Sequence, residues 1–78
     1  MSTRPAMSLE EVQQVLALTD RLGIHREAVK IPLMKGSGGV RQLPNGRLEI
    51  VIDAQLEFGQ ALTQIDAELR RILGSTED

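Results

Sequence analysis

Three carboxylates have the chemistry for acid–base catalysis: Asp53 ends a strand-like run, and Asp66 and Glu68 lie in a helical pattern. General acid–base catalysis needs such groups within reach of one substrate. Asp66 and Glu68 are two positions apart, and on a helix this spacing points them to different faces. Asp66 instead has Arg70 at i+4, the spacing of an ordinary surface ion pair. We therefore predict no catalytic residues and expect that the protein is not an enzyme.

The single histidine and a glycine-rich stretch are the other features with ligand-binding chemistry. His25 follows a helix, whose C-terminal dipole favours a charged imidazolium and hence a pH-sensitive group, although a solvated loop histidine is the simpler interpretation. A zinc site would need three carboxylates beside it, because the chain has no cysteine. The stretch 36–39, GSGG, leads into a strand and lacks the Lys-Ser/Thr and helix of a P-loop. We interpret it as a flexible connection and predict no cofactor and no metal site.

The elements that position these residues begin with a helix over 9–22. Ser8 and Glu11 have the spacing of a capping box, in which each side chain bonds the backbone N–H of the other residue. Gly23 follows the last apolar position as a left-handed cap, and Ile24 is placed to fold back on the last turn.

Strand patterns occupy the middle of the chain. Residues 29–35 alternate, with Leu33 on the same apolar face as the other odd positions, and Pro32 would keep this strand at a sheet edge because it cannot donate to a ladder. Residues 40–43 and 48–53 flank a Pro-Asn-Gly turn that is typical of a type I turn with a glycine bulge. The second of these runs has the clearest alternation in the chain.

A second helix is predicted to start between Asp53 and Glu57, with Asp53 as its candidate cap, and to end at Gly74. The predicted fold is α+β, in the order helix, small antiparallel sheet of two or three strands, helix (αβββα), with both helices on one face of the sheet. Residues 8–74 would form a single domain. Residues 1–7 and 75–78 are predicted to be a disordered arm and tail.

Length and composition limit the function classes. A chain of 78 residues with no cysteine builds a marginal core and has no disulfide to support it, so self-association is the expected source of stability. A net charge of −2 and a single aromatic residue, Phe58, argue against nucleic-acid binding on composition alone. The sequence contains neither a membrane-spanning run nor a secretory signal pattern, which favours the cytoplasm.

The part of the chain from Leu22 onward resembles the core of ImmA/IrrE-type zinc peptidases, which cleave repressor proteins. The resemblance lies in the Leu-Gly-Ile segment at the end of the first helix, the strand over 46–53 and the helical segment 65–73. Glu68 matches the general base of that family's HExxH motif, but Ala67 and Arg71 stand where its two zinc-binding histidines belong. The resemblance therefore implies a shared architecture or a catalytically dead relative.

Our leading functional hypothesis is a small, non-enzymatic cytoplasmic protein that self-associates as a homodimer and binds another, unknown protein. One alternative is a catalytically dead, peptidase-like accessory domain with a groove between the strand 48–53 and the helical segment 67–71. Another is a weak nucleic-acid-binding module that uses Arg41, Arg47, Arg70 and Arg71. The residues predicted to divide between the core and an interface are Leu16, Leu18, Phe58, Leu62, Leu69 and Ile72.

Overall fold

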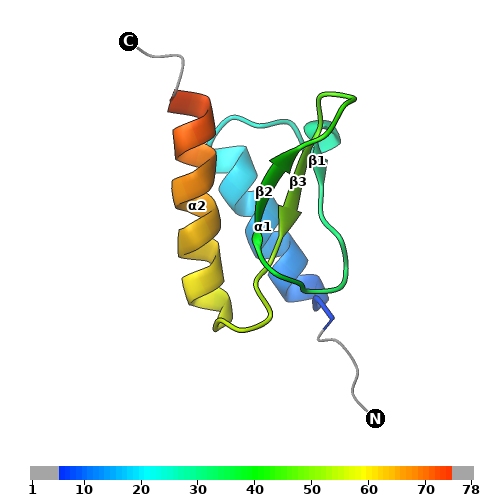
Figure 1. Ribbon diagram of the computed structural model, residues 1–78, viewed down its shortest axis with the longest axis vertical. Coiled ribbons are helices and arrows are strands. Elements are labelled where there is room, and N and C mark those ends of the chain that lie inside the picture. Colours follow the sequence, from blue (N-terminus) through cyan, green and yellow to red (C-terminus); the bar gives the residue numbers. More distant parts are fainter. Residues whose placement is uncertain (1–5, 75–78) are drawn as a thin grey trace.

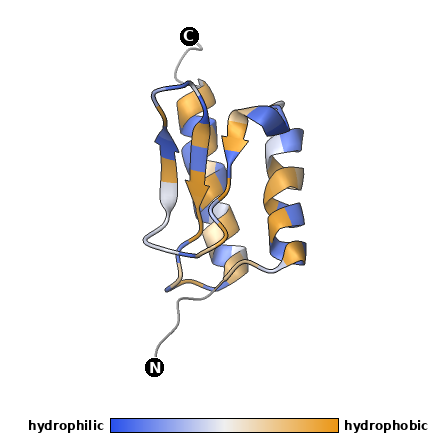
Figure 2. Ribbon diagram, turned by 90° about the vertical axis from the view of Figure 1, so that its right-hand side faces the viewer, coloured by the Kyte–Doolittle hydropathy of each residue, from blue (hydrophilic) through white to orange (hydrophobic). Residues whose placement is uncertain are grey.

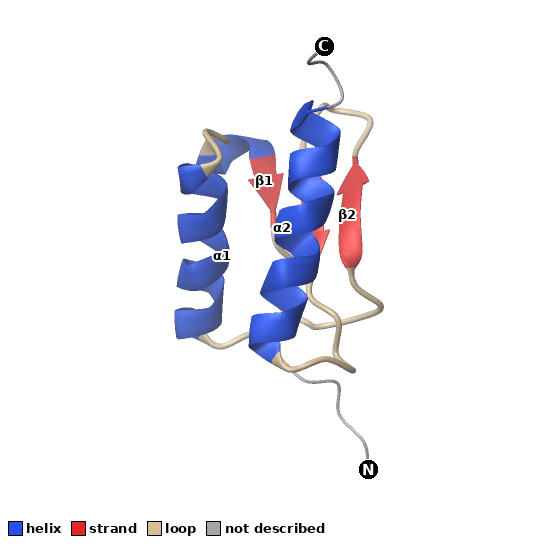
Figure 3. Cartoon of the chain, turned by 90° about the vertical axis from the view of Figure 1, so that its left-hand side faces the viewer, coloured by secondary structure: helices blue, strands red, loops and turns tan. Residues whose placement is uncertain are grey.

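The computed structural model describes residues 6–74, which form two helices packed on one face of a three-stranded sheet (Figure 1, Figure 3). This small α+β architecture, with the order helix, strands, helix, is the predicted one. None of the helices in these residues is long and apolar enough to cross a lipid bilayer. The elements are α1 (Leu9–Arg21), the 3₁₀ turn η1 (Arg26–Ala28), β1 (Val29–Lys30), β2 (Gly39–Gln42), β3 (Leu48–Val51) and α2 (Phe58–Gly74).

The sheet is mixed, which corrects the prediction of an antiparallel sheet. Its strand order is β1-β3-β2, with β1 parallel and β2 antiparallel to β3. The prediction placed the strand that contains Pro32 at one edge but gave no strand order. The connection over 31–38 carries the chain from one edge of the sheet to the other and reverses its direction, so that β1 and β2 do not pair.

Both ends of α1 follow the sequence. The Ser8 hydroxyl accepts from the Glu11 N–H at 3.1 Å, and the Glu11 carboxylate accepts from the Ser8 N–H at 3.0 Å, which completes the capping box. At the other end Gly23 has φ +81°, and the Ile24 N–H donates to the Thr19 carbonyl at 2.9 Å. This is a Schellman cap, and it turns Ile24 back toward the core.

The hairpin between β2 and β3 also forms as predicted, although β2 begins at Gly39. The Gly46 N–H donates to the Leu43 carbonyl at 2.9 Å, and the Leu43 N–H donates to the Arg47 carbonyl at 2.7 Å. Gly46 has φ +88°, the left-handed conformation that the bulge position requires. As predicted, the apolar residues Leu48 and Ile50 of β3 face the core and are buried.

The predicted strand over 29–35 is wrong beyond Lys30. Only two of these residues pair with β3, Val29 with Leu48 and Lys30 with Glu49. The chain then leaves the ladder near Pro32, so the period-two pattern no longer decides which side chains face inward. Leu33, predicted on the apolar face, is 65% exposed.

The candidate cap for the second helix also requires correction. The Asp53 carboxylate accepts from the Gln55 N–H at 2.8 Å, which stabilises a turn before the helix, and α2 begins only at Phe58. The glycine-rich connection is held against the same residue, because Gly36 forms a parallel bridge to Asp53 and its N–H donates to the Ile52 carbonyl at 2.9 Å. The connection is thus tied to the end of β3.

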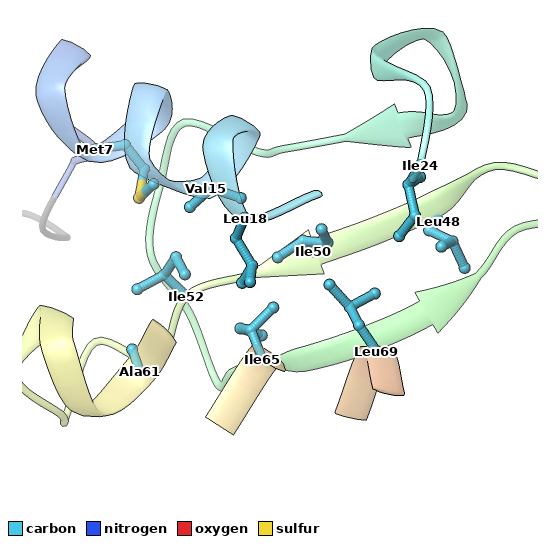
Figure 4. Packing of buried hydrophobic residues seen from close by; sticks show 10 residues of the cluster. All are labelled: Met7, Val15, Leu18, Ile24, Leu48, Ile50, Ile52, Ala61, Ile65 and Leu69. Atoms are coloured by element: carbon cyan, nitrogen blue, oxygen red, sulfur yellow. The ribbon is translucent and has the colours of Figure 1, made fainter. Parts of the chain in front are cut away.

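The core lies between the two helices and β3 (Figure 4). In α2 the buried positions recur every four residues, so that one stripe of the helix faces Ile50 and its neighbours. The opposite face of the sheet carries no helix (Figure 2). The buried apolar residues are Met7, Val15, Leu18, Ile24, Leu48, Ile50, Ile52, Ala61, Ile65 and Leu69.

Two residues of the predicted N-terminal arm fall within the described part of the chain. Ala6 forms an antiparallel bridge to Met34, and Met7 is buried in the core. The rest of that arm, residues 1–5, and the predicted tail, 75–78, lie outside the described residues.

Candidate protein-binding surfaces

Large apolar side chains are exposed at the end of the molecule where the chain enters α1. The Met7 N–H donates to the Leu33 carbonyl at 2.6 Å, which brings the segment before α1 beside residues 33–34. Leu9 is 74% exposed, Leu33 65% and Met34 44%. We call these three residues the apolar end. A monomer commonly exposes single leucines, but a group of this kind indicates a contact surface.

A shallow hollow of about 650 Å³ extends from Met34 over the uncovered face of the sheet. Pro32, Val51 and Ala54 supply apolar contacts to its lining. Farther along the same face, Arg41 Nη2 and Nε donate to one oxygen of Glu49 at 2.6 and 3.1 Å. The face therefore passes from an apolar half to a charged half.

A partly buried ion pair fastens the apolar end to both helices. Lys35 Nζ donates to Glu11 Oε2 at 3.2 Å and lies 5.8 Å from the centre of the Phe58 ring. The side chains of Lys35 and Glu11 are only 16% and 23% exposed. The pKa of Glu11 is lowered, mainly because its carboxylate accepts the Ser8 N–H and also because Lys35 lies beside it, and these effects outweigh its desolvation.

The outer edge of β2 is the third surface, and Glu68 of α2 reaches it. Glu68 Oε1 accepts from the Val40 N–H at 3.0 Å. A hollow of about 520 Å³ lies next to this contact, lined by Val40, Arg41, Gln42, Arg71 and Ile72. The residues that line this hollow thus come from β2 and from the C-terminal half of α2.

The structure divides the six predicted interface residues among three environments. Leu18 and Leu69 belong to the buried core, where Leu69 has no exposed surface. Phe58 and Leu62 are half-buried and pack against that core. Leu16 and Ile72 are also half-buried but lie outside the core cluster, and Ile72 lines the hollow beside β2.

The carboxylates considered for catalysis have separate structural partners. Asp66 pairs with Arg70 at 2.6 Å as predicted, Asp53 holds its turn, and Glu68 bonds β2. In the segment 65–73 of α2, Ala67 and Arg71 are both exposed, and Glu68 lies between them in sequence. Within residues 6–74 no group of three His, Cys, Asp or Glu side chains is placed to hold a metal ion.

Three of the four arginines of the nucleic-acid hypothesis have partners within the protein. Arg41 bonds Glu49, Arg70 bonds Asp66, and Arg47 Nε donates to the Glu27 carbonyl at 3.1 Å. Arg71 is exposed on α2. His25 is an exposed residue that precedes η1 without capping it through its side chain.

Sequence reasoning missed the residues that define two of these surfaces. Leu33 and Met34 were assigned to opposite faces of a strand that does not extend to them. The bond from Val40 to Glu68 spans 28 positions, and no local pattern connects these residues. The one usable signal was the proline at position 32, which marks the point where strand pairing becomes difficult.

Comparisons of the chain with known protein families, with curated proteins and with solved structures found no match.

Proposed function

We propose that this protein is a non-enzymatic module that self-associates as a homodimer and binds another protein. The observation that carries the proposal is the apolar end, where Leu9, Leu33 and Met34 leave much of their surface in water. Burying about 100 Å² of apolar surface stabilises an association by roughly 2.5 kcal/mol before its entropic costs. A second copy is the partner that a chain of this size needs most, because its own core is small.

The polar groups around the apolar end support a protein contact over a catalytic role. Lys35 and Glu11 form an ion pair with each other. The surface beside the exposed leucines therefore presents apolar groups with this ion pair at its border. Protein interfaces commonly combine an apolar centre with a polar rim in this way. The absence of cysteine suits a module that works in the reducing cytoplasm.

Sedimentation equilibrium over roughly 1–100 µM tests the proposal, on the scale of ordinary dimer affinities. We expect the mass of a dimer for the natural chain and of a monomer for Leu33→Lys, which places a charge in the apolar end. Leu73→Lys is the matched control, because Leu73 is 40% exposed in the last turn of α2, at the opposite end of the molecule (Figure 1). A monomer at every concentration, or a dimer that Leu33→Lys leaves intact, would contradict the assignment.

A further inference from the structure

The outer edge of β2 presents backbone groups that β3 does not use. The Val40 N–H bonds Glu68, so the backbone of Val40 points away from β3, whereas the Leu43 N–H bonds Arg47 across the hairpin. Backbone direction alternates along an antiparallel strand. Gln42 therefore points outward with Val40, while Arg41 bonds toward β3. The Gln42 N–H has no hydrogen-bond partner within residues 6–74.

The Glu68 carboxylate takes the place that a neighbouring strand would occupy at this edge. A strand added beside β2 would place a carbonyl oxygen in front of the Val40 N–H, and Glu68 Oε1 now accepts that hydrogen bond at 3.0 Å. The side chain comes from a different element, α2, and reaches β2 through this one carboxylate oxygen. Displacing this carboxylate would break one hydrogen bond, whereas displacing a paired strand would break several.

Two arginines line the hollow beside the edge, and the carboxylates of Glu49 and Glu68 lie next to it. Its lining combines the apolar side chains of Val40 and Ile72 with two arginines, Arg41 and Arg71, and includes no acidic residue. The Arg41 side chain stays 73% exposed although it pairs with Glu49. A peptide with acidic side chains complements this lining, and arginine binds carboxylates in a two-pronged geometry.

We propose that β2 and the C-terminal half of α2 bind an extended acidic peptide of another protein, which adds to the sheet as a fourth strand beside β2. Main-chain hydrogen bonds to Val40 and Gln42 would hold the peptide, and the carboxylates on the side of the peptide that faces α2 would lie near Arg71. This inference rests on the proposed function, because it names the site and the chemistry of the partner.

A second copy of the chain fits this edge poorly. In a two-fold symmetric pair of β2 strands, the register that uses both outward residues of each copy pairs Val40 of one copy with Gln42 of the other. That register places Arg41 of one copy directly opposite Arg41 of the other. Like charges at directly opposed positions are destabilising. The homodimer contact is therefore assigned to the apolar end, and the β2 edge to a different chain.

A backbone substitution tests the edge directly. The probe is a fluorescein-labelled peptide, acetyl-Thr-Val-Glu-Val-Glu-Val-Thr-amide, titrated with the full chain at low salt and followed by anisotropy. Gln42→Pro removes the outward N–H without removing a bond to β3, and proline is tolerated on edge strands. We expect Gln42→Pro to lower the affinity for the probe at least tenfold, because it removes one hydrogen bond between neutral groups and shifts the bound peptide out of its register. Gln42→Ala keeps the N–H and should change affinity less than about twofold.

Charge is tested by reversing Arg71. Arg71→Glu should weaken binding of the acidic probe and strengthen binding of a second probe with lysine in place of both glutamates. Arg21→Glu is the matched control, since Arg21 also lies exposed in the last turn of a helix and does not line the hollow. In a third arm, Glu68→Ala frees the Val40 N–H and should tighten binding of the acidic probe several-fold.

The mass of every sample is measured by sedimentation, so that failure of the peptide site can be distinguished from failure of the proposed self-association. A dimer that fails to bind the acidic probe overturns the peptide site and leaves self-association intact. Equal binding by Gln42→Pro and Gln42→Ala, with circular dichroism showing both folded, also overturns it. A monomer that binds the acidic probe in a manner dependent on Gln42 and Arg71 supports the site and contradicts the homodimer alone.

Discussion

Glu11 joins two local interactions whose effects can be separated. Its carboxylate accepts the Ser8 N–H in the capping box and also the Lys35 ammonium, 24 positions along the chain. Glutamine at this position can still accept the Ser8 N–H, because the capping box admits Glu or Gln. Replacing Glu11 by glutamine therefore removes the charge and leaves the cap in place.

We expect Glu11→Gln to lower the free energy of unfolding at pH 7 by roughly 1 kcal/mol or less, since the ion pair is partly solvated. The pKa of Glu11 is lowered in the folded protein, first by the Ser8 N–H and then by Lys35. A lowered folded pKa contributes stability above the unfolded pKa, which is lost as the pH falls through the folded value. The difference between the natural chain and Glu11→Gln should therefore be largest at pH 7 and shrink toward pH 3.

Urea denaturation at pH 7 and pH 3 measures this difference. Glu10→Gln is the control, because Glu10 is the neighbouring exposed acid in the same first turn and makes the same change in net charge. A Glu11→Gln effect that is equal at both pH values, or that Glu10→Gln reproduces, would mean that Lys35 does not stabilise the folded state through Glu11.

At the scale of elements, the connection between β1 and β2 decides the topology, and its close packing makes a second prediction. A Cβ added to Gly38 would lie 2.8 Å from the Asp53 Cβ, and Gly38 has φ +87°. Gly46 in the hairpin has nearly the same φ, +88°, but nothing lies within 4 Å of an added Cβ. The two glycines differ mainly in available space.

We expect Gly46→Ala to destabilise the fold by roughly 1 kcal/mol from backbone strain alone, and Gly38→Ala by roughly 2–4 kcal/mol because overpacking is added to the same strain. Thermal and urea unfolding of the two variants measure the difference. Equal losses of stability in the two variants would show that the connection can shift away from Asp53 at little cost, and that its close packing does not fix the position of β2 relative to the end of β3.

Local signals predicted the parts of the fold that depend on neighbouring residues. The capping box at Ser8 and the left-handed glycines at 23 and 46 each solve a local hydrogen-bonding or backbone problem, and all three appear in the structure. The parallel pairing of β1 with β3 depends on where a connection crosses the sheet, which no periodic pattern encodes. The same holds for the contact of Glu68 with Val40, and so for the edge of β2 as a site.

At the scale of the whole molecule, self-association and stability should be coupled. A partner that binds only the folded chain raises its apparent stability, and for a dimer the effect grows with protein concentration. A tenfold increase in concentration adds about 1.4 kcal/mol per dimer, which for an assembly of this size raises Tm by roughly 3–6 °C. Calorimetric scans at two concentrations above the dissociation constant measure this shift.

Leu33→Lys should abolish the concentration dependence, because it places a charge among the exposed apolar side chains. Leu73→Lys should retain it, since that residue belongs to the other end of the molecule. The uncovered sheet face and the small core leave the monomer with little stability to spare, so we expect the Leu33→Lys chain to melt at the value that the natural chain approaches on dilution. A Tm that is independent of concentration in the natural chain would show that two helices and β3 close a sufficient core on their own, and would remove the energetic reason for a dimer.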